Sequence, residues 1–449
     1  MRVRWVYVTG LCLLVAGWQG CIDASLRGCW ANHSPTSTLS LEKQPQTESS
    51  TDSIEFVGSF PGQIAGFIPD GRGVATYEFD GKQTRIFSLD GTELMSFSDA
   101  GIRFAPNGQL MALMSPGGYN PTLEYTTCLM TLKGKEIASF SGLFPTFTLE
   151  AELLIIQDQD DQRSRLVNFA GAEIAVLEGT YFGPILGPKY IVTSSEIADR
   201  YYFYLYDLNG VEIAAFPGDS EGWIEMLDYQ NFLVSEADQT RWFDRSGVVL
   251  ATYPGTIAGT LPDSQAIFLY SRAEDTTRLV GLDGEEIASY AGLFSALAPD
   301  NQSVVTGSFE DDITRIYALD GTEIAVISGD LREFVLDGEG IIISSRDQQN
   351  SDDQKSSLYT FEGVEIATYM GKYATETFLP DSGIVITSTS QQPDIGPPLN
   401  ETHLHRPEGR LLATVEGSFD GISPDHELLA VSSNDSRQTT DLYRILIGE

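Results

Sequence analysis

Short segments of alternating apolar and polar residues follow one another from residue 53 to residue 449, with turn signals between them. A clear example is TRIYALDGTEIAVI, at residues 314–327. Its alternation and its β-branched and aromatic residues are typical of strands. Asp320-Gly321 lies at the centre, and this pair tolerates the positive φ angles of a tight hairpin turn. The segment therefore predicts two antiparallel strands joined by a short turn.

This hairpin recurs through almost the whole chain. Its turn glycine reappears at intervals of 37 to 46 residues, as Gly91, Gly134, Gly171, Gly210, Gly247, Gly284, Gly321, Gly363 and Gly409. Variations on Glu-Ile-Ala follow the turn, for example from Glu136, Glu173, Glu212, Glu286 and Glu365. A second glycine usually stands two residues beyond this strand. Repetition at such an interval indicates a repeat architecture rather than several separate domains.

Three further strands complete each unit. The next strand ends in many units at a Pro-Asp type of turn, as in residues 64–71, 257–264 and 294–301. An apolar strand follows, as in residues 111–115, 153–157 and 341–345. The last strand opens in five units with Thr-Arg or Ser-Arg, at Thr84, Ser164, Thr240, Thr277 and Thr314. Four short strands per repeat predict an all-β fold of the β-propeller type.

The units number ten, and their ends complement each other. The first begins with strand 53–60, which has no hairpin glycine before it, and the last ends with strand 441–447. We expect these two strands to pair, complete the final blade and remove two exposed edges. The prediction is one ring of ten four-stranded blades. Two smaller rings in tandem, or an incompletely closed array, remain alternatives, although no linker interrupts the repeats.

Residues 53–449 resemble the WD40-repeat propeller family, especially bacterial arrays with Glu-Ile-Ala and Pro-Asp-Gly motifs. The repeats here lack that family's Gly-His pair. Its Trp-Asp pair is replaced by Tyr317-Ala318 or Phe87-Ser88, among others. The family's His–Asp–Ser/Thr–Trp hydrogen-bond network is therefore not expected. The resemblance implies a propeller that binds protein partners.

The N-terminus resembles a bacterial lipoprotein signal. Arg2 and Arg4 precede an uncharged apolar run that is short for a membrane span, and Gly20-Cys21 follows it. We expect residues 1–20 to be a signal peptide and Cys21 to be lipidated, although Trp18 and Gln19 depart from the lipoprotein pattern. Ordinary cleavage near Gly17 and an uncleaved anchor are the alternatives. The rest of residues 21–52, rich in Ser, Thr, Gln and Pro towards its end, reads as a flexible tether.

The charge balance narrows the choice of partners. The chain carries 64 acidic and 27 basic residues, a formal net charge of −37, which disfavours nucleic-acid binding. Acidic residues gather in the variable loops, which are the candidate partner-facing sites: Asp158, Asp160, Asp161, Glu310, Asp311, Asp312, Asp352 and Asp353. The alternative is that these loops are merely solvated and paired in part with the nearby Thr-Arg arginines.

Candidate chemistry is sparse. Asp158, Asp160 and Asp161 could attract calcium but lack the order of an EF-hand loop. His403 and His405 face the same side of a strand, which suits a core-lining or exposed pair better than a metal site. Cys29 and Cys128 could pair in an oxidising compartment. Common nucleophile and phosphate-loop motifs are absent. We therefore expect no cofactor and assign no catalytic, cofactor-binding or metal residue.

The sequence thus predicts an exported, lipid-anchored scaffold of the bacterial cell envelope or periplasm. We expect a monomer that binds protein partners and touches a membrane only through its N-terminal anchor. The alternative is an envelope enzyme or carbohydrate-binding propeller that uses the axial cleft. Calcium-dependent adhesion is a third possibility.

Overall fold

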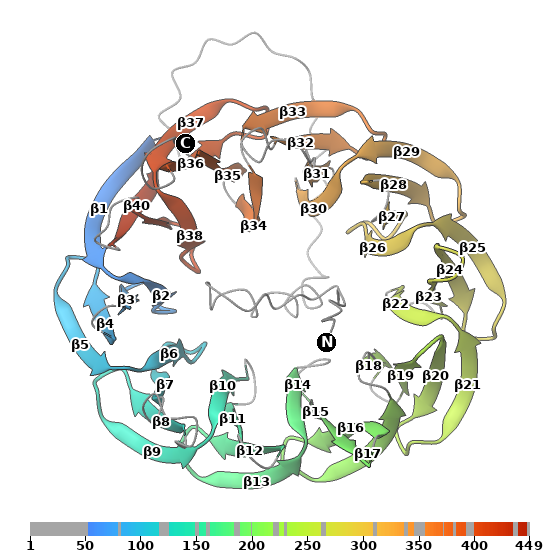
Figure 1. Ribbon diagram of the computed structural model, residues 1–449, viewed down its shortest axis with the longest axis horizontal. Helices are drawn as coiled ribbons and strands as arrows, with labels where there is room; N and C mark the ends of the chain where they lie inside the picture. Colours follow the sequence, from blue (N-terminus) through green and yellow to red (C-terminus); the bar gives the residue numbers. More distant parts are fainter. Residues whose placement is uncertain are drawn as a thin grey trace, which may run out of the picture.

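The computed structural model shows one closed ring of ten four-stranded antiparallel sheets (Figure 1). It describes residues 53–79, 82–115, 125–148, 152–158, 162–183, 189–198, 200–218, 224–228, 231–261, 266–308, 312–335, 340–344, 355–370, 372–379, 383–391, 399–433 and 439–446. Within these ranges every regular element is a strand. The predicted all-β propeller of ten blades is confirmed, and tandem rings and an open array are excluded. The described residues contain no helix long and apolar enough to cross a membrane.

The strands of each blade follow chain order from the axis to the rim, except in blade 10. Blades 1 to 5 are β2 (Gln63–Phe67), β3 (Gly73–Glu78), β4 (Gln83–Ser88), β5 (Glu93–Ser98); β6 (Gly101–Phe104), β7 (Leu110–Ser115), β8 (Thr126–Thr131), β9 (Glu136–Ser141); β10 (Leu143–Phe147), β11 (Leu153–Gln157), β12 (Arg163–Asn168), β13 (Glu173–Glu178); β14 (Thr180–Gly183), β15 (Tyr190–Ile197), β16 (Arg200–Asp207), β17 (Glu212–Gly218); and β18 (Ile224–Asp228), β19 (Asn231–Glu236), β20 (Gln239–Asp244), β21 (Val249–Pro254).

Blades 6 to 10 are β22 (Thr256–Thr260), β23 (Ala266–Ser271), β24 (Thr276–Gly281), β25 (Glu286–Ala291); β26 (Leu293–Leu297), β27 (Ser303–Ser308), β28 (Ile313–Ala318), β29 (Glu323–Ser328); β30 (Asp330–Val335), β31 (Gly340–Ser344), β32 (Lys355–Thr360), β33 (Glu365–Met370); β34 (Lys372–Leu379), β35 (Ile384–Gln391), β36 (Leu399–His405), β37 (Leu411–Glu416); and β38 (Ser418–Ile422), β39 (Leu428–Ser432), β40 (Thr439–Leu446), β1 (Ser53–Pro61).

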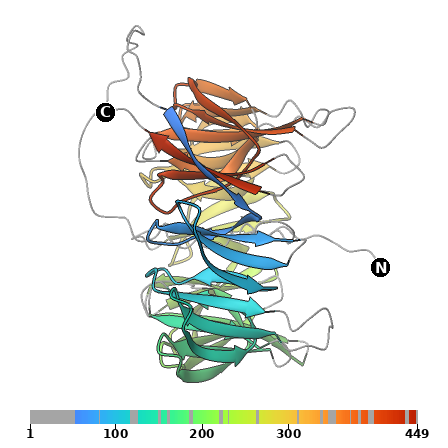
Figure 2. The ribbon, with the colours of Figure 1, turned by 90° about the vertical axis from the view of Figure 1, so that its left-hand side faces the viewer.

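The two ends of the chain close the ring as predicted. Strand β1 is the outer strand of blade 10 and pairs antiparallel with β40, from Ser53 opposite Leu446 to Pro61 opposite Thr439. The first and last coloured segments therefore lie side by side in Figures 1 and 2. Phe60 of β1 is only 1% exposed, because it packs between blades 10 and 1. The closure is thus a hydrophobic contact as well as a strand pairing.

Each core cluster is shared by two neighbouring blades. One cluster joins Phe268 and Tyr290 of blade 6 to Val304 and Tyr317 of blade 7. The next joins Ile316 of blade 7 to residues of blade 8. Side chains alternate along a strand, so each strand packs against the preceding blade with one face and the following blade with the other. A single blade has no complete core of its own, which is why the repeats form a ring.

The Glu-Ile-Ala motif has a geometric explanation. In all nine hairpins that carry the turn glycine, the outer strand has a β-bulge that leaves its second residue unpaired; Ile324 of β29 is an example. The following residue, usually alanine, often lies under the turn glycine of the next blade. A Cβ added at Gly210 would come 2.2 Å from the Cβ of Ala175, and one at Gly363 would come 2.8 Å from that of Ala325. Small residues are needed on both sides of this contact.

The second repeated glycine joins two hydrogen bonds. In blade 7, the hydroxyl of Thr314 donates to the carbonyl of Gly329 at 2.6 Å, and the Gly329 N–H donates to the carbonyl of Asp312 at 2.7 Å. Gly329 has φ 115°, and a Cβ there would come 2.7 Å from the carbonyl oxygen of Ser344. Only glycine fits such a position without strain. The corresponding Thr or Ser hydroxyl bond occurs in blades 1, 2, 3, 5, 6, 7, 9 and 10.

Candidate binding face

The strand order places two kinds of connection on opposite faces of the ring. Within a blade, the connections from first to second strand and from third to outer strand leave one face, because neighbouring strands are antiparallel. The connections from second to third strand leave the other face, together with those that lead to the next blade. Strands run along the ring axis in the edge-on view (Figure 2). Asp158 and Asp312, the two predicted acidic residues that are described, belong to connections on this second face, which we call the loop face.

The frame beneath the loop face is fixed by the glycine-centred bonds. In five blades the glycine after the outer strand donates its N–H to the residue that enters the third strand: Gly142 to Tyr125, Gly255 to Asp238, Gly292 to Asp275, Gly329 to Asp312 and Gly417 to Asn400. These bonds are 2.7 to 2.9 Å long. One end of each of these loops is therefore held in the same place from blade to blade, while the loop sequence varies.

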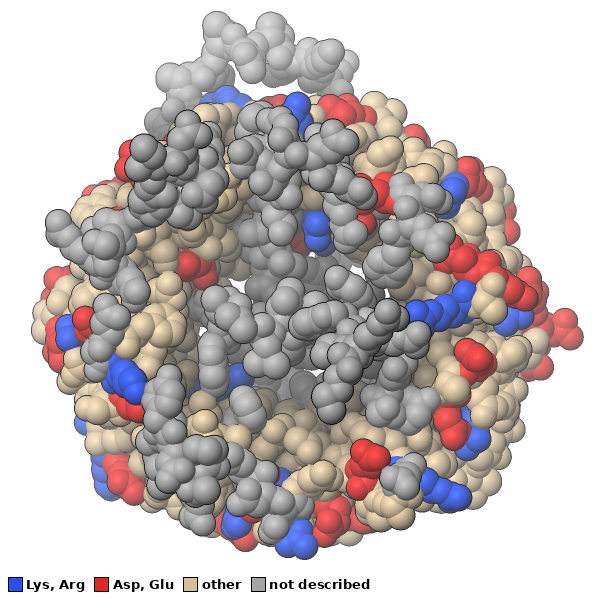
Figure 3. All heavy atoms as spheres, in the orientation of Figure 1, with Lys and Arg blue, Asp and Glu red and all other residues tan. Residues whose placement is uncertain are grey.

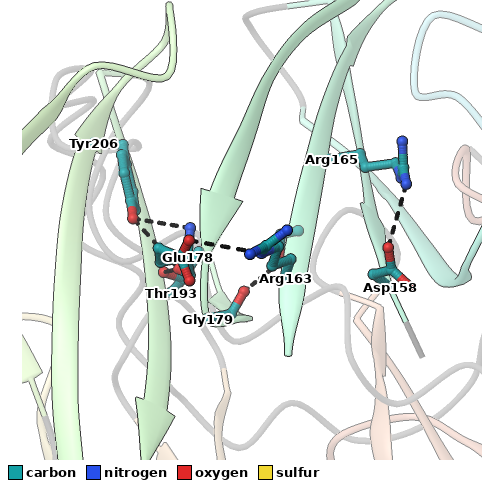
Figure 4. Close-up of polar contacts among 8 residues, drawn as sticks. Asp158, Arg163, Arg165, Glu178, Gly179, Thr193 and Tyr206 are labelled. Carbon is teal, nitrogen blue, oxygen red and sulfur yellow. Dashed lines mark hydrogen bonds and ion pairs between the residues drawn. The ribbon is translucent and has the colours of Figure 1, made fainter. Parts of the chain in front are cut away.

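Two of the predicted acidic residues can be placed. Asp158 lies 3.3 Å from the guanidinium of Arg165 (Figure 4). Arg165 also contacts Glu173, at 2.9 Å. These partners raise the pKa of Arg165, with the Glu173 hydrogen bond contributing most. Asp312 contributes its backbone carbonyl to Gly329. Asp160, Asp161, Glu310, Asp311, Asp352 and Asp353 lie outside the described residues, as do Cys21 and Cys29.

The Asp158 contact matches the alternative interpretation, in which loop carboxylates pair with arginines of the repeat. Such pairing also occurs in Arg85–Glu78 and Arg241–Glu236, at 3.1 and 2.6 Å. On the face shown in Figure 3, acidic and basic residues are interspersed around the periphery. Arginines of the repeat thus neutralise part of the acidic surface locally.

Blades 3 and 4 show how a polar junction between blades is built. The Thr193 hydroxyl donates to the carbonyl of Glu178, and the Glu178 N–H donates to the hydroxyl of Tyr206 at 3.1 Å (Figure 4). Burial is the main cause that raises the pKa of Tyr206 to about 12. Arg163 lies 3.6 Å from the Glu178 carboxylate. The bonds of Thr193 and Tyr206 to Glu178 tie blade 4 to blade 3, whereas the ion pair of Arg163 with Glu178 lies within blade 3.

Two carboxyl groups on inner strands were missed by sequence analysis. Asp420 of β38 accepts a hydrogen bond from Ser432, yet burial raises its pKa to about 6. Glu225 of β18 accepts a 2.9 Å bond from Thr260 of the next blade, and burial raises its pKa too. They belong to blades 10 and 5, on opposite sides of the ring in Figure 1, so they do not form a carboxylate pair. Their inner-strand position was the available signal, but a single sequence does not show its burial.

The histidine pair belongs to the core. His403 and His405 are 9% and 5% exposed, and their rings lie 6.1 Å apart. His403 contacts the hydroxyls of Thr389 and Thr414 at 3.1 and 3.0 Å. Burial, followed by the charge of His403, lowers the pKa of His405 to about 4, so His405 is neutral at pH 7. The core-lining interpretation of this pair is confirmed.

The residues considered for metal and thiol chemistry lie partly inside and partly outside the described ranges. Within the described ranges, no three His, Cys, Asp or Glu residues lie close enough to hold a metal ion. The calcium prediction involves Asp160 and Asp161 and so remains a prediction. Cys128 is a free thiol in the described part of the chain, and burial chiefly raises its pKa, which disfavours the reactive thiolate.

A cleft opens on the outer flank of the seam where blades 9 and 10 meet. Its volume is 530 Å³, and its polar lining comes from Thr414, Glu416, Ser433, Asp441 and Tyr443. Burial, Asp441 and Glu416 together raise the pKa of Tyr443. This cleft was not predicted, although the sequence contains one signal for it. Asp441 follows Thr440 at the position where five other repeats have arginine after Thr or Ser.

Comparisons with known proteins leave the family open. No protein-family model matches the chain, and no curated protein matches its sequence. Similar solved structures include a eukaryotic initiation factor, with 11% identity, TM-score 0.47 and coverage of 84% of this chain and 90% of that one. Dihydro-heme d1 dehydrogenase NirN has 14% identity, TM-score 0.35 and coverage of 73% and 75%. Apo AztD from Citrobacter koseri has 10% identity, TM-score 0.33 and coverage of 71% and 95%. The fold assignment therefore rests on strand pairing.

Proposed function

We propose that this chain is an exported, non-catalytic scaffold of the bacterial cell envelope, a WD40-like propeller that presents its acidic loop face to protein partners. The observation that carries the proposal is the contrast between frame and loops. Repeated hydrogen bonds hold the frame in register, and the sequence varies most in loops that leave one face. Variable loops on a rigid scaffold are a common arrangement for binding.

A comparison of charge variants tests this proposal. One variant neutralises the loop through Glu310→Gln, Asp311→Asn and Asp312→Asn. Its matched control neutralises three outer-strand glutamates, through Glu286→Gln, Glu323→Gln and Glu365→Gln. Cross-linking and affinity capture from detergent extracts should recover a partner with the wild-type and control proteins, and lose it with the loop variant. Equal recovery by both variants, or no partner for any of them, would overturn the proposal.

The proposed location depends on the N-terminus. We propose cleavage before Cys21 and attachment of lipid to its thiol, with residues 22–52 as a tether to the ring. Mass spectrometry of the mature N-terminus should show a lipid-modified Cys21, and Cys21→Ala should move the protein from the membrane to the soluble fraction. An unmodified N-terminus further along the chain would refute the anchor without affecting the loop-face test.

The second candidate function is an envelope enzyme or carbohydrate-binding propeller that uses the axial side of the ring. It is favoured by Glu225 and Asp420, because carboxyl groups with raised pKa values often occur at functional sites. Glu225→Gln and Asp420→Asn should then each abolish turnover or binding of a glycan panel. Activity that survives both changes would remove this candidate.

A further inference from the structure

The seam cleft between blades 9 and 10 differs from the same place in five other blades, which we call the regular blades. The difference lies in the residue after the buried Thr or Ser of the third strand, which also varies in blades 2, 8 and 9, where it is Cys128, Ser357 and His403. In five blades this residue is arginine: Arg85, Arg165, Arg241, Arg278 and Arg315. Thr440 is that buried Thr in blade 10, since its hydroxyl donates to the Gly62 carbonyl as Thr314 donates to Gly329. The next residue is Asp441.

Backbone register confirms that the two positions correspond. Thr440 pairs with Phe60 and Asp441 with Ser59 across β40 and β1, just as Thr314 pairs with Ile327 and Arg315 with Val326 across β28 and β29. Two residues beyond, Tyr317 packs in the core shared with the preceding blade, and so does Tyr443. Since side chains alternate along a strand, Asp441 and Arg315 both point towards the preceding blade.

In the regular blades this flank holds a guanidinium. Arg278 donates from Nη2 to the carbonyl of Pro254, the last residue of the preceding outer strand, at 3.1 Å. Arg315 lies in the same part of blade 7 and contacts Glu323 of its own outer strand at 3.0 Å. The Arg315 side chain is 28% exposed, so the flank shields it only partly from solvent.

At the seam a carboxylate replaces the arginine, and a second carboxylate stands at the end of the preceding outer strand. Asp441 replaces the arginine, and Glu416 ends β37 as Pro254 ends β21. Both carboxylates line the 530 Å³ cleft, next to the hydroxyls of Ser433 and Tyr443. Two carboxylates and nearby hydroxyls provide the acceptors that a planar, five-donor guanidinium requires.

We propose that the seam cleft binds an arginine side chain supplied by another polypeptide, in the place that a built-in arginine occupies in five other blades. The carboxylates of Asp441 and Glu416 receive the guanidinium, and the hydroxyls complete its hydrogen bonds. This inference adds a ligand class to the proposed scaffold and a site that contains none of the eight predicted acidic loop residues, although it lies at the same end of the blades as the loop face. It rests on that proposal only for the identity of the donor polypeptide.

The test uses the full-length protein and Nα-acetyl-arginine methylamide, with binding measured by calorimetry at low and physiological salt. The citrulline analogue is the matched ligand control, because it keeps the shape and loses the charge. We expect the arginine probe to bind at least tenfold more tightly than the citrulline probe. Equal binding of the two probes, or no binding of either, would overturn the proposal.

Protein variants locate the binding. Asp441→Arg installs the residue of the regular blades. It should weaken binding of the arginine probe at least tenfold, with the melting temperature retained. Asp441→Asn provides a second variant with little change of shape and should also weaken binding of the probe. Glu323→Gln removes a carboxylate from a flank that already contains Arg315 and should leave binding unchanged. Unaltered affinity in both folded Asp441 variants would refute the site.

The result is independent of the partner-capture experiment. Loss of probe binding in the Asp441 variants, together with unchanged partner capture by the loop-face variant, would support the cleft and reject the loop-face scaffold. The opposite pattern would retain the scaffold and reject the cleft.

Discussion

Blades 7 and 10 contain the same hydroxyl-to-carbonyl bond, but the chain reaches it by different routes. Thr314 and Gly329 are 15 residues apart, whereas Thr440 and Gly62 are 378 apart. The longer loop costs about 3 kcal/mol more in chain entropy on a logarithmic scale. A single hydrogen bond contributes only about 0.5–1.5 kcal/mol. The two blades therefore share the local geometry of this bond, whereas closure of the ring needs the whole of β1.

Removal of β1 should have the largest effect on stability, because the closure of blade 10 depends on this strand. Deletion of residues 53–61 exposes the edge of β40 and the core around Phe60, a side chain whose loss alone typically costs about 3–5 kcal/mol. We expect a large fall in the melting temperature and concentration-dependent association, measured by circular dichroism and size-exclusion chromatography.

A deletion of nine residues from the tether, residues 40–48, is the matched control and should leave both measurements unchanged. Addition of the peptide SIEFVGSFP should raise the melting temperature of the protein that lacks β1. An unaltered melting temperature after removal of β1 would show that closure contributes nothing to stability.

Loss of the shared hydroxyl should affect the two blades similarly at equilibrium. Thr314→Val and Thr440→Val each leave a buried glycine carbonyl without its side-chain donor, which should lower the free energy of unfolding by about 1–3 kcal/mol. Urea titration measures this change. Hydrogen exchange should distinguish the two, because only Thr440→Val should accelerate exchange in β1. Equal exchange in β1 for both variants would contradict the special role of Thr440 in the pairing of β1 with β40.

The pH dependence of stability should also distinguish blade 10 from blade 7. Asp420 in blade 10 and Ser295 in blade 7 both occupy the bulge of the inner strand. The pKa of Asp420 is raised from 3.8 to about 6, so between those values the native state binds more protons than the unfolded state. This contribution to stability is fully present below pH 3.8 and is lost as pH rises through 6.

Asp420→Ser should therefore stabilise the protein at pH 7 by about 1–2 kcal/mol, a value reduced for the partial solvent access of this carboxyl. The gain should shrink below pH 6 and disappear below pH 4. Differential scanning calorimetry across this range provides the measurement, with Ser295→Ala as the control. A gain that does not vary with pH would disprove the titration of Asp420 as its cause.

The smallest effect is expected at the arginine flank of blade 7. Arg315 and Glu323 are 28% and 46% exposed, so Arg315→Ala should cost only about 0.2–1 kcal/mol, measured by thermal melting at low salt. High salt should reduce the difference. A cost above that range, or one insensitive to salt, would mean that the arginine acts mainly through packing.

The fold could be predicted from the sequence because every repeat contains similar signals. Each turn glycine, Thr hydroxyl and Glu-Ile-Ala strand is visible in one copy and reinforced by the others, and the unmatched strands at the two ends predicted the closure. The pairing of Asp158 with Arg165 was also predictable, since the two residues follow one another across a short loop.

The sites were harder to predict because they depend on neighbouring blades. Burial of Glu225 comes with Thr260 of the next blade, 35 residues later in the chain. Asp441 can be seen to replace an arginine, but its meaning depends on Glu416, which lies in the preceding blade. Repeat alignment describes what the blades share, whereas a binding site is formed where one blade differs.

The bulged outer strands also limit how far each sheet can extend. An outer strand normally exposes backbone donors and acceptors to which another chain could add a fifth strand. Here the unpaired residue, Ile324 in blade 7, twists the strand at its start, and Glu323 places a charge beside it. The nine outer strands that share this bulge are therefore poor templates for intermolecular sheet growth. A protein with nine such edges can thus remain dispersed, although its described residues lie mostly in β-strands.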